Sequence, residues 1–319
     1  MHPVYEHLLK AVEADPLPAA YTSSYWQRFG REAVVERHGE ALVLRGVEFG
    51  AVATRNPARH LCHWLERLSY RAVTASLPAY PAVWRAVKQL ARDCGYSLTF
   101  DVWKSGVALA TLADHWERHE LSPRRFALIG DGYGFLGVLI RRWIPEATVY
   151  CIDLPKTLVF QARTHERAFP QARMAVLDEG GPSGEAAVTF VPPPHVERIP
   201  DRIDCAVNIA SMQEMNPFTI ATYFTMLRRR SGPQSRFYCV NRQRKELPGG
   251  EVSCFDAYPW RAEDEIFLDG PCPYYTRFLA LSTRPSGPRV AGVRVPFVNG
   301  FDGVHWHRLA RLAPEASHA

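Results

Sequence analysis

Three glycines and one acidic residue have the types and spacing of a site that binds a nucleoside-containing ligand. The stretch FALIGDGYGFLGVLIRRW, residues 126–143, places Gly130, Gly132 and Gly134 between an apolar run and an amphipathic run. Such a turn lets the chain reverse sharply and lets a ligand approach bare backbone. Asp153 ends the next apolar run, where a carboxylate can accept hydrogen bonds from the hydroxyls of a ribose. The spacing therefore predicts a site for a ligand that contains adenosine.

The kind of ligand depends on Asp131, which lies inside the turn. Gly132, Gly134 and Gly137 also fit the G-x-G-x-x-G pattern of dinucleotide-binding proteins. A carboxylate at position 131 would face a pyrophosphate at a helix N-terminus, where anions normally bind. S-adenosylmethionine has no phosphate and presents an ammonium and a sulfonium instead. The residues favour this methyl donor, and a nicotinamide-dependent oxidoreductase stays open as the alternative.

The elements that must position these residues change in character along the chain. The first part predicts helices, because Tyr5, Leu8, Leu9 and Val12 form an i, i+3, i+4, i+7 stripe, and it includes a short hairpin at 40–50. From about residue 124, apolar runs alternate with helical stripes, which is typical of a parallel sheet covered by helices. The predicted strands are 125–130, 147–153, 186–191, 203–211, 235–240, 275–283 and 303–313.

We therefore expect an α/β fold: a Rossmann-like, seven-stranded, mostly parallel sheet with helices on both faces. Residues 1–120 would form a mainly helical N-terminal cap that binds substrate. Residues 121–319 would form the donor-binding domain, with a lid insertion around 241–272. The run RRR at 228–230 is interpreted as the polar end of a helix, where cations suit the helix dipole.

Composition narrows the class of protein. The formal charge is only +5, and no basic stretch is interleaved with aromatics, so a nucleic-acid groove is not expected. No stretch approaches the roughly 18 apolar residues of a membrane span. The seven cysteines are scattered without metal-ligand spacing, which indicates a reduced cytoplasmic protein and no metal centre. The expected partner is a small-molecule acceptor, with a homodimer left open.

Residues 126–240 resemble a class I S-adenosylmethionine-dependent methyltransferase. Together with NIASMQEMNPFTIATYF at 208–224 and FYCVNRQRKELPGGEVSCFDAYPW at 237–260, they are similar to the bacterial sugar O-methyltransferases of natural-product and polysaccharide pathways. The resemblance implies methyl transfer to a hydroxyl of a sugar or glycosylated intermediate, with adenine near the loop 192–199. It implies donor contacts at Gly130, Asp131, Gly132, Gly134, Asp153, Leu154, Asn208 and Ser211.

Transfer of a methyl group to a hydroxyl requires in-line alignment and usually a general base. Substrate binds outside the carboxyl ends of the strands, where Glu214 follows the fourth predicted strand. Glu214 is a candidate base, or else an acid that complements a helix start. The remaining candidates are Asn241 and His305 for catalysis, and Arg242, Asp256 and Trp26 for binding the acceptor. The alternatives are an N- or C-methyltransferase and a cyclase that binds the donor without transferring its methyl group.

Overall fold

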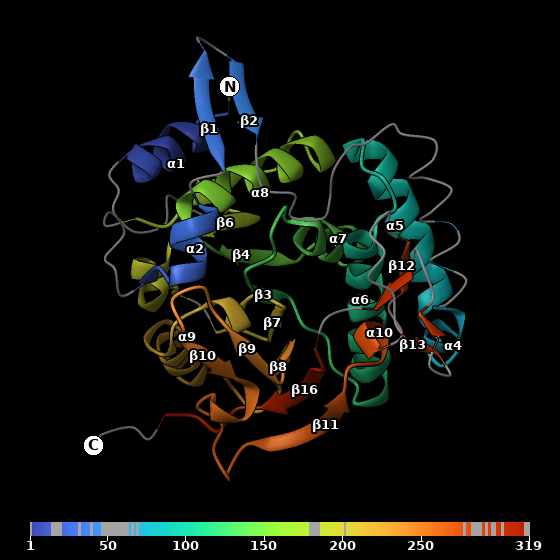
Figure 1. The fold of residues 1–319 in the computed structure, drawn as a ribbon. Coiled ribbons are helices and arrows are strands. Elements are labelled where there is room, and N and C mark those ends of the chain that lie inside the picture. Colours follow the sequence, from blue (N-terminus) through green and yellow to red (C-terminus); the bar gives the residue numbers. More distant parts are fainter. Residues whose placement is uncertain are drawn as a thin grey trace.

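A computed structural model of the chain describes most of its residues. These are 2–13, 21–30, 33–38, 41–45, 64, 67, 70–178, 186–200, 202–276, 279–281, 289–290, 293–294, 298–300 and 303–315. The centre of the molecule is an eight-stranded sheet with the order β11-β16-β8-β7-β3-β4-β6-β5 (Figure 1). Its strands are β3 (Arg125–Ile129), β4 (Thr148–Ile152), β5 (Met174–Val176), β6 (Val188–Val191), β7 (Cys205–Ile209), β8 (Arg236–Arg242), β11 (Glu265–Pro271) and β16 (His305–Arg311).

The strand order reverses at β3. From β3 the chain adds β4 and β6 on one side, and it then returns to add β7 and β8 in parallel on the other side. β16 alone runs in the opposite direction, and it pairs antiparallel with β8 on one side and with β11 on the other. In an open sheet of this kind, ligands bind outside the carboxyl ends of the strands at the reversal. The topology therefore places the expected site at the ends of β3, β4 and β7.

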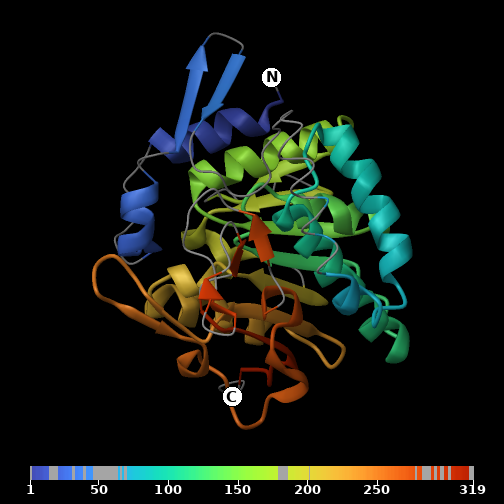
Figure 2. The same ribbon diagram turned by 45° about the vertical axis from the view of Figure 1, so that its right-hand side comes forward.

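Helices cover both faces of this sheet, as predicted, and alternate residues of each strand point to opposite faces. Phe126 and Leu128 of β3 belong to one hydrophobic cluster, whereas Ala127 and Ile129 belong to the other. The first cluster includes α1 (Val4–Glu13), α5 (Tyr80–Cys94), α6 (Phe100–Arg118), α7 (Phe135–Trp143) and α8 (Pro155–Ala168). The second includes η2 (Pro193–Arg198) and α9 (Pro217–Arg230). Figure 2 shows the sheet between these groups of helices.

Two strand predictions were wrong. The sheet has eight strands rather than seven, because β5 pairs in parallel with β6 at one edge. The antiparallel partner of β16 is β11, which lies inside the segment predicted as a lid. The apolar run at 275–283 contributes β12 (Leu279–Leu281) instead, and β12 pairs with β15 (Val298–Gly300) outside the main sheet.

The rest of the segment 241–272 begins at the carboxyl end of β8, and its last part, just before β11, contacts Arg228 in the last turn of α9. It contains the hairpin of β9 (Arg244–Glu246) and β10 (Val252–Cys254), followed by η4 (Phe255–Ala257). After β11 the chain forms α10 (Pro273–Thr276), and a further pair of short strands, β13 (Arg289–Val290) and β14 (Val293–Arg294), precedes β15.

The N-terminal part contributes to the same core as the sheet. Helices α5 and α6 pack against each other and against α7, and α1 packs against α8. The hairpin is β1 (Val34–His38) with β2 (Ala41–Arg45), several residues earlier than predicted. The helices α2 (Ser24–Phe29) and α4 (Arg71–Thr74) complete this part. A separate cap that ends at residue 120 stays a prediction.

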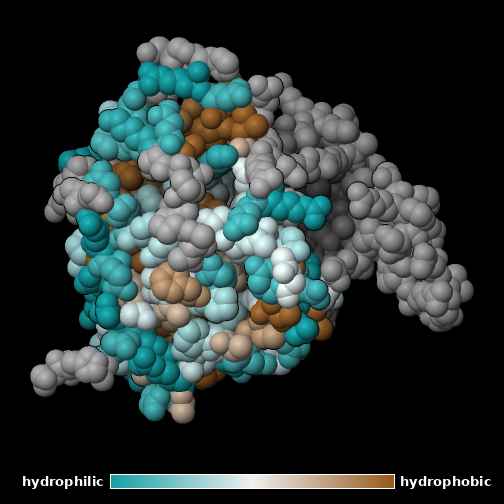
Figure 3. Space-filling model, turned by 60° about the vertical axis from the view of Figure 1, so that its left-hand side comes forward, coloured by the Kyte–Doolittle hydropathy of each residue, from teal (hydrophilic) through white to brown (hydrophobic). Residues whose placement is uncertain are grey.

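The described surface is mostly polar in the view of Figure 3, with hydrophobic residues in separate small groups. The large exposed hydrophobic side chains come from different elements, among them Phe218 of α9, Val252 of β10 and Ile266 of β11. None of the described helices is both long enough and apolar enough to span a membrane.

Candidate functional site

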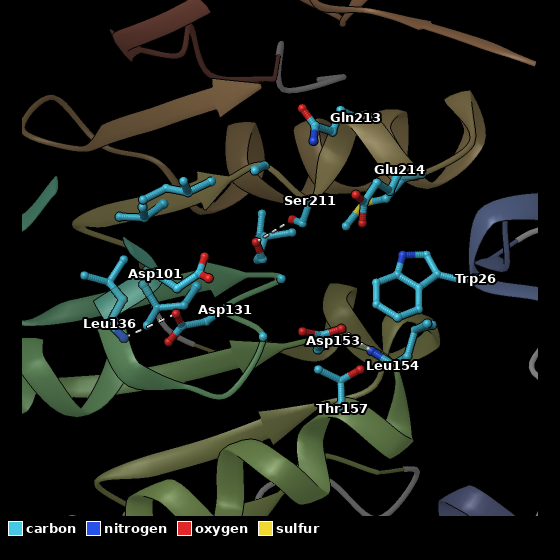
Figure 4. Close-up of a pocket in the computed structure, with 18 of the residues that line it drawn as sticks. Trp26, Asp101, Asp131, Leu136, Asp153, Leu154, Thr157, Ser211, Gln213 and Glu214 are labelled. Atoms are coloured by element: carbon cyan, nitrogen blue, oxygen red, sulfur yellow. Dashed lines mark hydrogen bonds between the residues drawn. The ribbon is translucent and has the colours of Figure 1, made fainter. Parts of the chain in front are cut away.

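A cavity of about 400 Å³ opens at the carboxyl ends of β3, β4 and β7 (Figure 4). Its wall includes Gly130, Asp131 and Gly132 after β3, Asp153 and Leu154 after β4, and Ser211 after β7. Side chains from other elements, among them α2, α6, β9 and α10, also line it. The cavity therefore lies at the reversal of strand order, and its size is within the range of ligand-binding pockets.

The glycine turn presents bare backbone because side chains do not fit there. Gly130, Gly132 and Gly134 all have positive φ, at 72°, 57° and 80°. A Cβ at Gly130 would fall on the Oγ and Cβ atoms of Ser211. Gly134 does not line the cavity; it precedes α7 and lies against the backbone of Gln161. The structure thus places Gly130 and Gly132 at the ligand surface and Gly134 behind it.

Asp131 binds the start of α7. Its carboxylate accepts hydrogen bonds from the backbone N–H groups of Leu136, at 3.3 Å, and Gly137, at 2.8 Å. Burial raises the pKa of Asp131 to about 7, although these two hydrogen bonds and Lys104 lower it in part. The protein's own carboxylate therefore occupies the anion-binding position of this helix, where the pyrophosphate of a dinucleotide would otherwise bind.

Asp153 lies directly after β4 with its carboxylate in the cavity wall. It accepts hydrogen bonds from the backbone N–H of Leu154 and from the side-chain amide of Gln161, both at 2.8 Å. Burial raises its pKa to about 8, and nearby Asp131 raises it further, against the hydrogen bonds from Leu154, Gln161 and Thr157. Since a carboxylate can accept about four hydrogen bonds, Asp153 is able to bind a ligand hydroxyl as well.

Asn208 and Asn241 lie beneath the cavity rather than in its wall. Both side chains are fully buried. The amide of Asn208 donates to Ile129 O at 2.8 Å and to Ser211 Oγ, while Asn241 donates to Asn208 Oδ1 at 2.7 Å. Asn241 Oδ1 also accepts from the backbone N–H of Gln213 at 3.0 Å. These amides therefore hold the turn after β7 in place, and a ligand in the cavity would contact Ser211 instead.

Glu214 faces the cavity from the short helix η3 (Met212–Glu214). It forms an ion pair with Lys245 of β9 at 2.6 Å and a hydrogen bond with the Tyr25 side chain of α2. Lys245 also lies 4.3 Å from the centre of the Tyr25 ring. Burial raises the pKa of Glu214 overall, and Lys245 and Tyr25 lower it in part. Glu214 is thus a partly desolvated carboxylate with a fixed position.

The other predicted residues are divided between the cavity and its surroundings. Trp26 and Arg242 line the cavity, and Figure 4 shows Trp26 beside Leu154. Asp256 is exposed on η4 and does not line it. His305 is buried and stacks on Tyr275 at 3.9 Å between ring centres, so it contacts the cavity wall from behind. Burial lowers the pKa of His305 to about 3, which keeps its ring neutral.

Several lining residues were not predicted from the sequence. They include Asp101, Lys104, Gln213, Lys245 and Tyr275. The signal that could have revealed two of them is that Asp101 and Lys104 interrupt the mostly apolar start of α6. The loop 192–199, predicted near the adenine, does not contribute to the cavity wall. Within the described residues, no three His, Cys, Asp or Glu side chains are grouped so as to hold a metal ion.

Fold and site together define a doubly wound α/β domain with a ligand cavity where the strand order reverses. No protein-family model matches the chain, and no curated protein matches it. Solved structures with a similar arrangement include TehB from Haemophilus influenzae, at 12% identity over 64% of this chain and 62% of that one, TM-score 0.39. Another is the glycopeptide N-methyltransferase MtfA, at 10% identity over 63% and 89%, TM-score 0.35.

A third similar structure concerns the conversion of a disulfide bond into a thioacetal group during echinomycin biosynthesis. It shares 13% identity over 64% of this chain and 82% of that one, with a TM-score of 0.38.

Proposed function

We propose that this protein is an S-adenosylmethionine-dependent methyltransferase that acts on a hydroxyl of a small molecule. The observation that carries the proposal is that the glycine turn and Asp153 open into one cavity. The glycines of the turn carry no side chains of their own, and Asp153 offers a carboxylate to a ribose hydroxyl. The acceptor we propose is a sugar or a glycosylated natural-product intermediate.

The position of Asp131 favours this donor over a nicotinamide cofactor. Its carboxylate already accepts the N–H groups of Leu136 and Gly137 at the start of α7. A pyrophosphate there would meet a carboxyl group in place of free N–H donors, and repulsion would be strong whenever that group is ionised. A donor with cationic groups and no phosphate meets no such obstacle.

When bound, the donor supplies a methyl group on a positively charged sulfur. The residues of this chain must then hold the acceptor hydroxyl in line and receive its proton. Glu214 is the candidate base, because its carboxylate faces the cavity and burial raises its pKa. As the new carbon–oxygen bond forms and the carbon–sulfur bond breaks, the hydroxyl proton would pass to Glu214. Lys245 and Tyr25 would keep the carboxylate in position.

Replacement of Asp153 with alanine should weaken binding of S-adenosylmethionine tenfold or more. The variant removes the hydrogen bonds that the carboxylate would form with the ribose, and each hydrogen bond to a charged group is worth about 1.5–3 kcal/mol. Isothermal titration calorimetry of the purified protein measures the effect. The matched control is Asp93→Ala, which removes an exposed carboxylate on α5. Equal affinities of Asp153→Ala and the unaltered protein would contradict the proposed ribose contact.

Donor binding should also strengthen as the pH rises towards 8. With a pKa raised to about 8, Asp153 is largely protonated in the free protein at pH 6 to 7, whereas ribose hydroxyls donate to the ionised form. Binding therefore releases a proton, and affinity should increase by up to about tenfold per pH unit before it levels off above pH 8. Titration with 5′-methylthioadenosine tests this, since that ligand lacks the titratable aliphatic amine of the donor. A dependence that persists in Asp153→Asn would implicate Asp131 or Glu214 instead.

Mass spectrometry of reactions with candidate acceptors separates the remaining alternatives. An O-methyltransferase produces S-adenosylhomocysteine and an acceptor that is one methyl group heavier, and nuclear magnetic resonance locates that group on oxygen. Methylation at nitrogen or carbon would identify the N- or C-methyltransferase alternative. Conversion of the acceptor without gain of a methyl group would identify the cyclase. A change in nicotinamide fluorescence on mixing would favour the oxidoreductase.

A further inference from the structure

Two opposite charges stand together on the cavity wall, in the first turns of α6. Asp101 and Lys104 both line the cavity, and Lys104 Nζ forms an ion pair with the carboxylate of Asp101. The two side chains are 33% and 19% exposed, so both are partly removed from solvent. On a free helix surface, a pair with this spacing contributes only about 0.2–0.5 kcal/mol. Because both side chains line the cavity, they can also contact a bound ligand.

The surroundings keep Lys104 charged and fixed. The side chain of Tyr275 forms a hydrogen bond with Lys104, and the Tyr275 ring stacks on the buried His305. Burial by itself lowers the pKa of Lys104, but Asp101 and Tyr275 together raise it above its ordinary value. The cavity therefore contains a permanent cation beside a carboxylate, on an otherwise largely apolar helix.

The pair lies on the opposite side of the glycine turn from Asp153. Figure 4 shows Asp101 near Asp131 on one side of the cavity, and Asp153 with Leu154 on the other. Gly130 and Gly132, which flank Asp131 in the chain, line the same cavity. An elongated ligand whose pentose binds Asp153 and whose middle rests on the glycine turn would therefore end at Asp101 and Lys104.

We propose that Lys104 and Asp101 bind the zwitterionic amino-acid end of the donor, with Lys104 on its carboxylate and Asp101 on its ammonium. This inference rests on the proposed function. A zwitterion adds no net charge to a partly desolvated cavity, and it replaces one ion pair by two. A ligand end with only a carboxylate or only an ammonium would form just one of these two ion pairs. Its desolvation would therefore cost more free energy relative to the interaction gained. Tyr275 acts as a positioning residue for Lys104.

Three ligands that differ only at this end test the proposal by calorimetry. S-adenosylhomocysteine has both charged groups, its decarboxylated amine retains only the ammonium, and 5′-methylthioadenosine has neither. Lys104→Met should weaken S-adenosylhomocysteine tenfold or more, and it should leave 5′-methylthioadenosine unchanged and the amine no weaker. Asp101→Asn should weaken both S-adenosylhomocysteine and the amine. The control Lys88→Met removes an exposed cation of α5 and should change none of the three.

Other outcomes overturn the inference. If Lys104→Met weakens all three ligands equally, or none of them, the pair does not recognise the amino-acid end. Thermal unfolding midpoints identify a variant that does not fold, and Lys104→Gln then replaces Lys104→Met with the same expected pattern. If the unaltered protein binds none of the three ligands, the proposed function itself fails. If the protein instead binds all three ligands equally well with and without Lys104 and Asp101, only this inference fails.

Discussion

Gly130→Ala should abolish measurable donor binding and lower the free energy of unfolding by about 3 kcal/mol. The residue has a φ of +72°, and a left-handed conformation costs a non-glycine residue about 1–2 kcal/mol. The added Cβ would also fall on Ser211, and overpacking of this kind typically costs about 1–3 kcal/mol. Ser211 is not free to move, because its Oγ donates to Ile129 O at 3.0 Å and accepts from Asn208. Urea denaturation and calorimetric titration measure the two effects.

Gly95→Ala is the matched control for this change. Gly95 ends α5 with a φ of 70°, and a Cβ there would meet nothing within 4 Å. Its substitution should therefore cost only the backbone strain and leave donor binding intact. A second test adds Ser211→Gly to Gly130→Ala, which removes both atoms that the new Cβ would meet and should recover part of the stability. If the two glycine substitutions cost the same, crowding at Ser211 is not the cause.

The sequence predicted the central part of this site because its signals are local. A glycine turn between a strand and a helix, with an acid after the next strand, constrains backbone and side chain within one β-α-β unit. Gly130, Gly132 and Asp153 consequently lie together in the structure. The same cavity is also lined by residues from distant parts of the chain, namely Asp101, Lys104, Lys245 and Tyr275. Nothing in their immediate sequence indicates which strand ends they will face.

Prediction of the strands of the sheet from the sequence is limited in the same way. The edge strand β11 has a largely exposed pattern, so it lacks the apolar run that marks a buried strand, and the more apolar stretch at 275–283 was assigned to the sheet instead. At the strand ends, Asn208 and Asn241 were expected to face a ligand. Buried amides there bind the backbone and each other, since unpaired polar groups are costly inside a protein. The periodicity of hydrophobic residues and the polarity of a side chain do not distinguish an asparagine that binds a ligand from one that binds buried backbone.

The run RRR at 228–230 does end a helix, as predicted, but its first arginine is buried. Arg228 forms two hydrogen bonds with Asp264, at 2.6 and 2.9 Å, and it also donates to the backbone carbonyls of Pro259 and Ala313. The exposed fractions of the two side chains are 1% and 0%. One guanidinium therefore joins α9 to the segment before β11 and to the chain after β16. This contact could not be inferred from the run itself.

Arg228→Met should consequently destabilise the fold by about 3–5 kcal/mol, because it leaves the Asp264 carboxylate buried without its cation. Arg229→Met is the control: the pair of Arg229 with Glu197 is exposed, at 54% and 39%, and its loss should cost less than about 1 kcal/mol. Urea denaturation of both variants near neutral pH measures the difference. Similar costs for the two neighbours would contradict a structural role for the buried pair.

The pH dependence of the stability lost in Arg228→Met identifies the cause of that loss. Burial raises the pKa of Asp264, but hydrogen bonds from Arg228 and from the backbone N–H groups of Arg261 and Ala313 lower it below its ordinary value overall. A group with a depressed pKa in the folded state stabilises the protein above its unfolded pKa, near 4, and loses that contribution as the pH falls. The deficit of Arg228→Met should therefore be largest near neutral pH and shrink below about pH 4, where Asp264 becomes protonated. A deficit that stays constant between pH 7 and pH 3 would instead indicate lost packing around the arginine side chain. Adding Asp264→Leu to Arg228→Met should restore part of the stability, since it removes the uncompensated carboxylate.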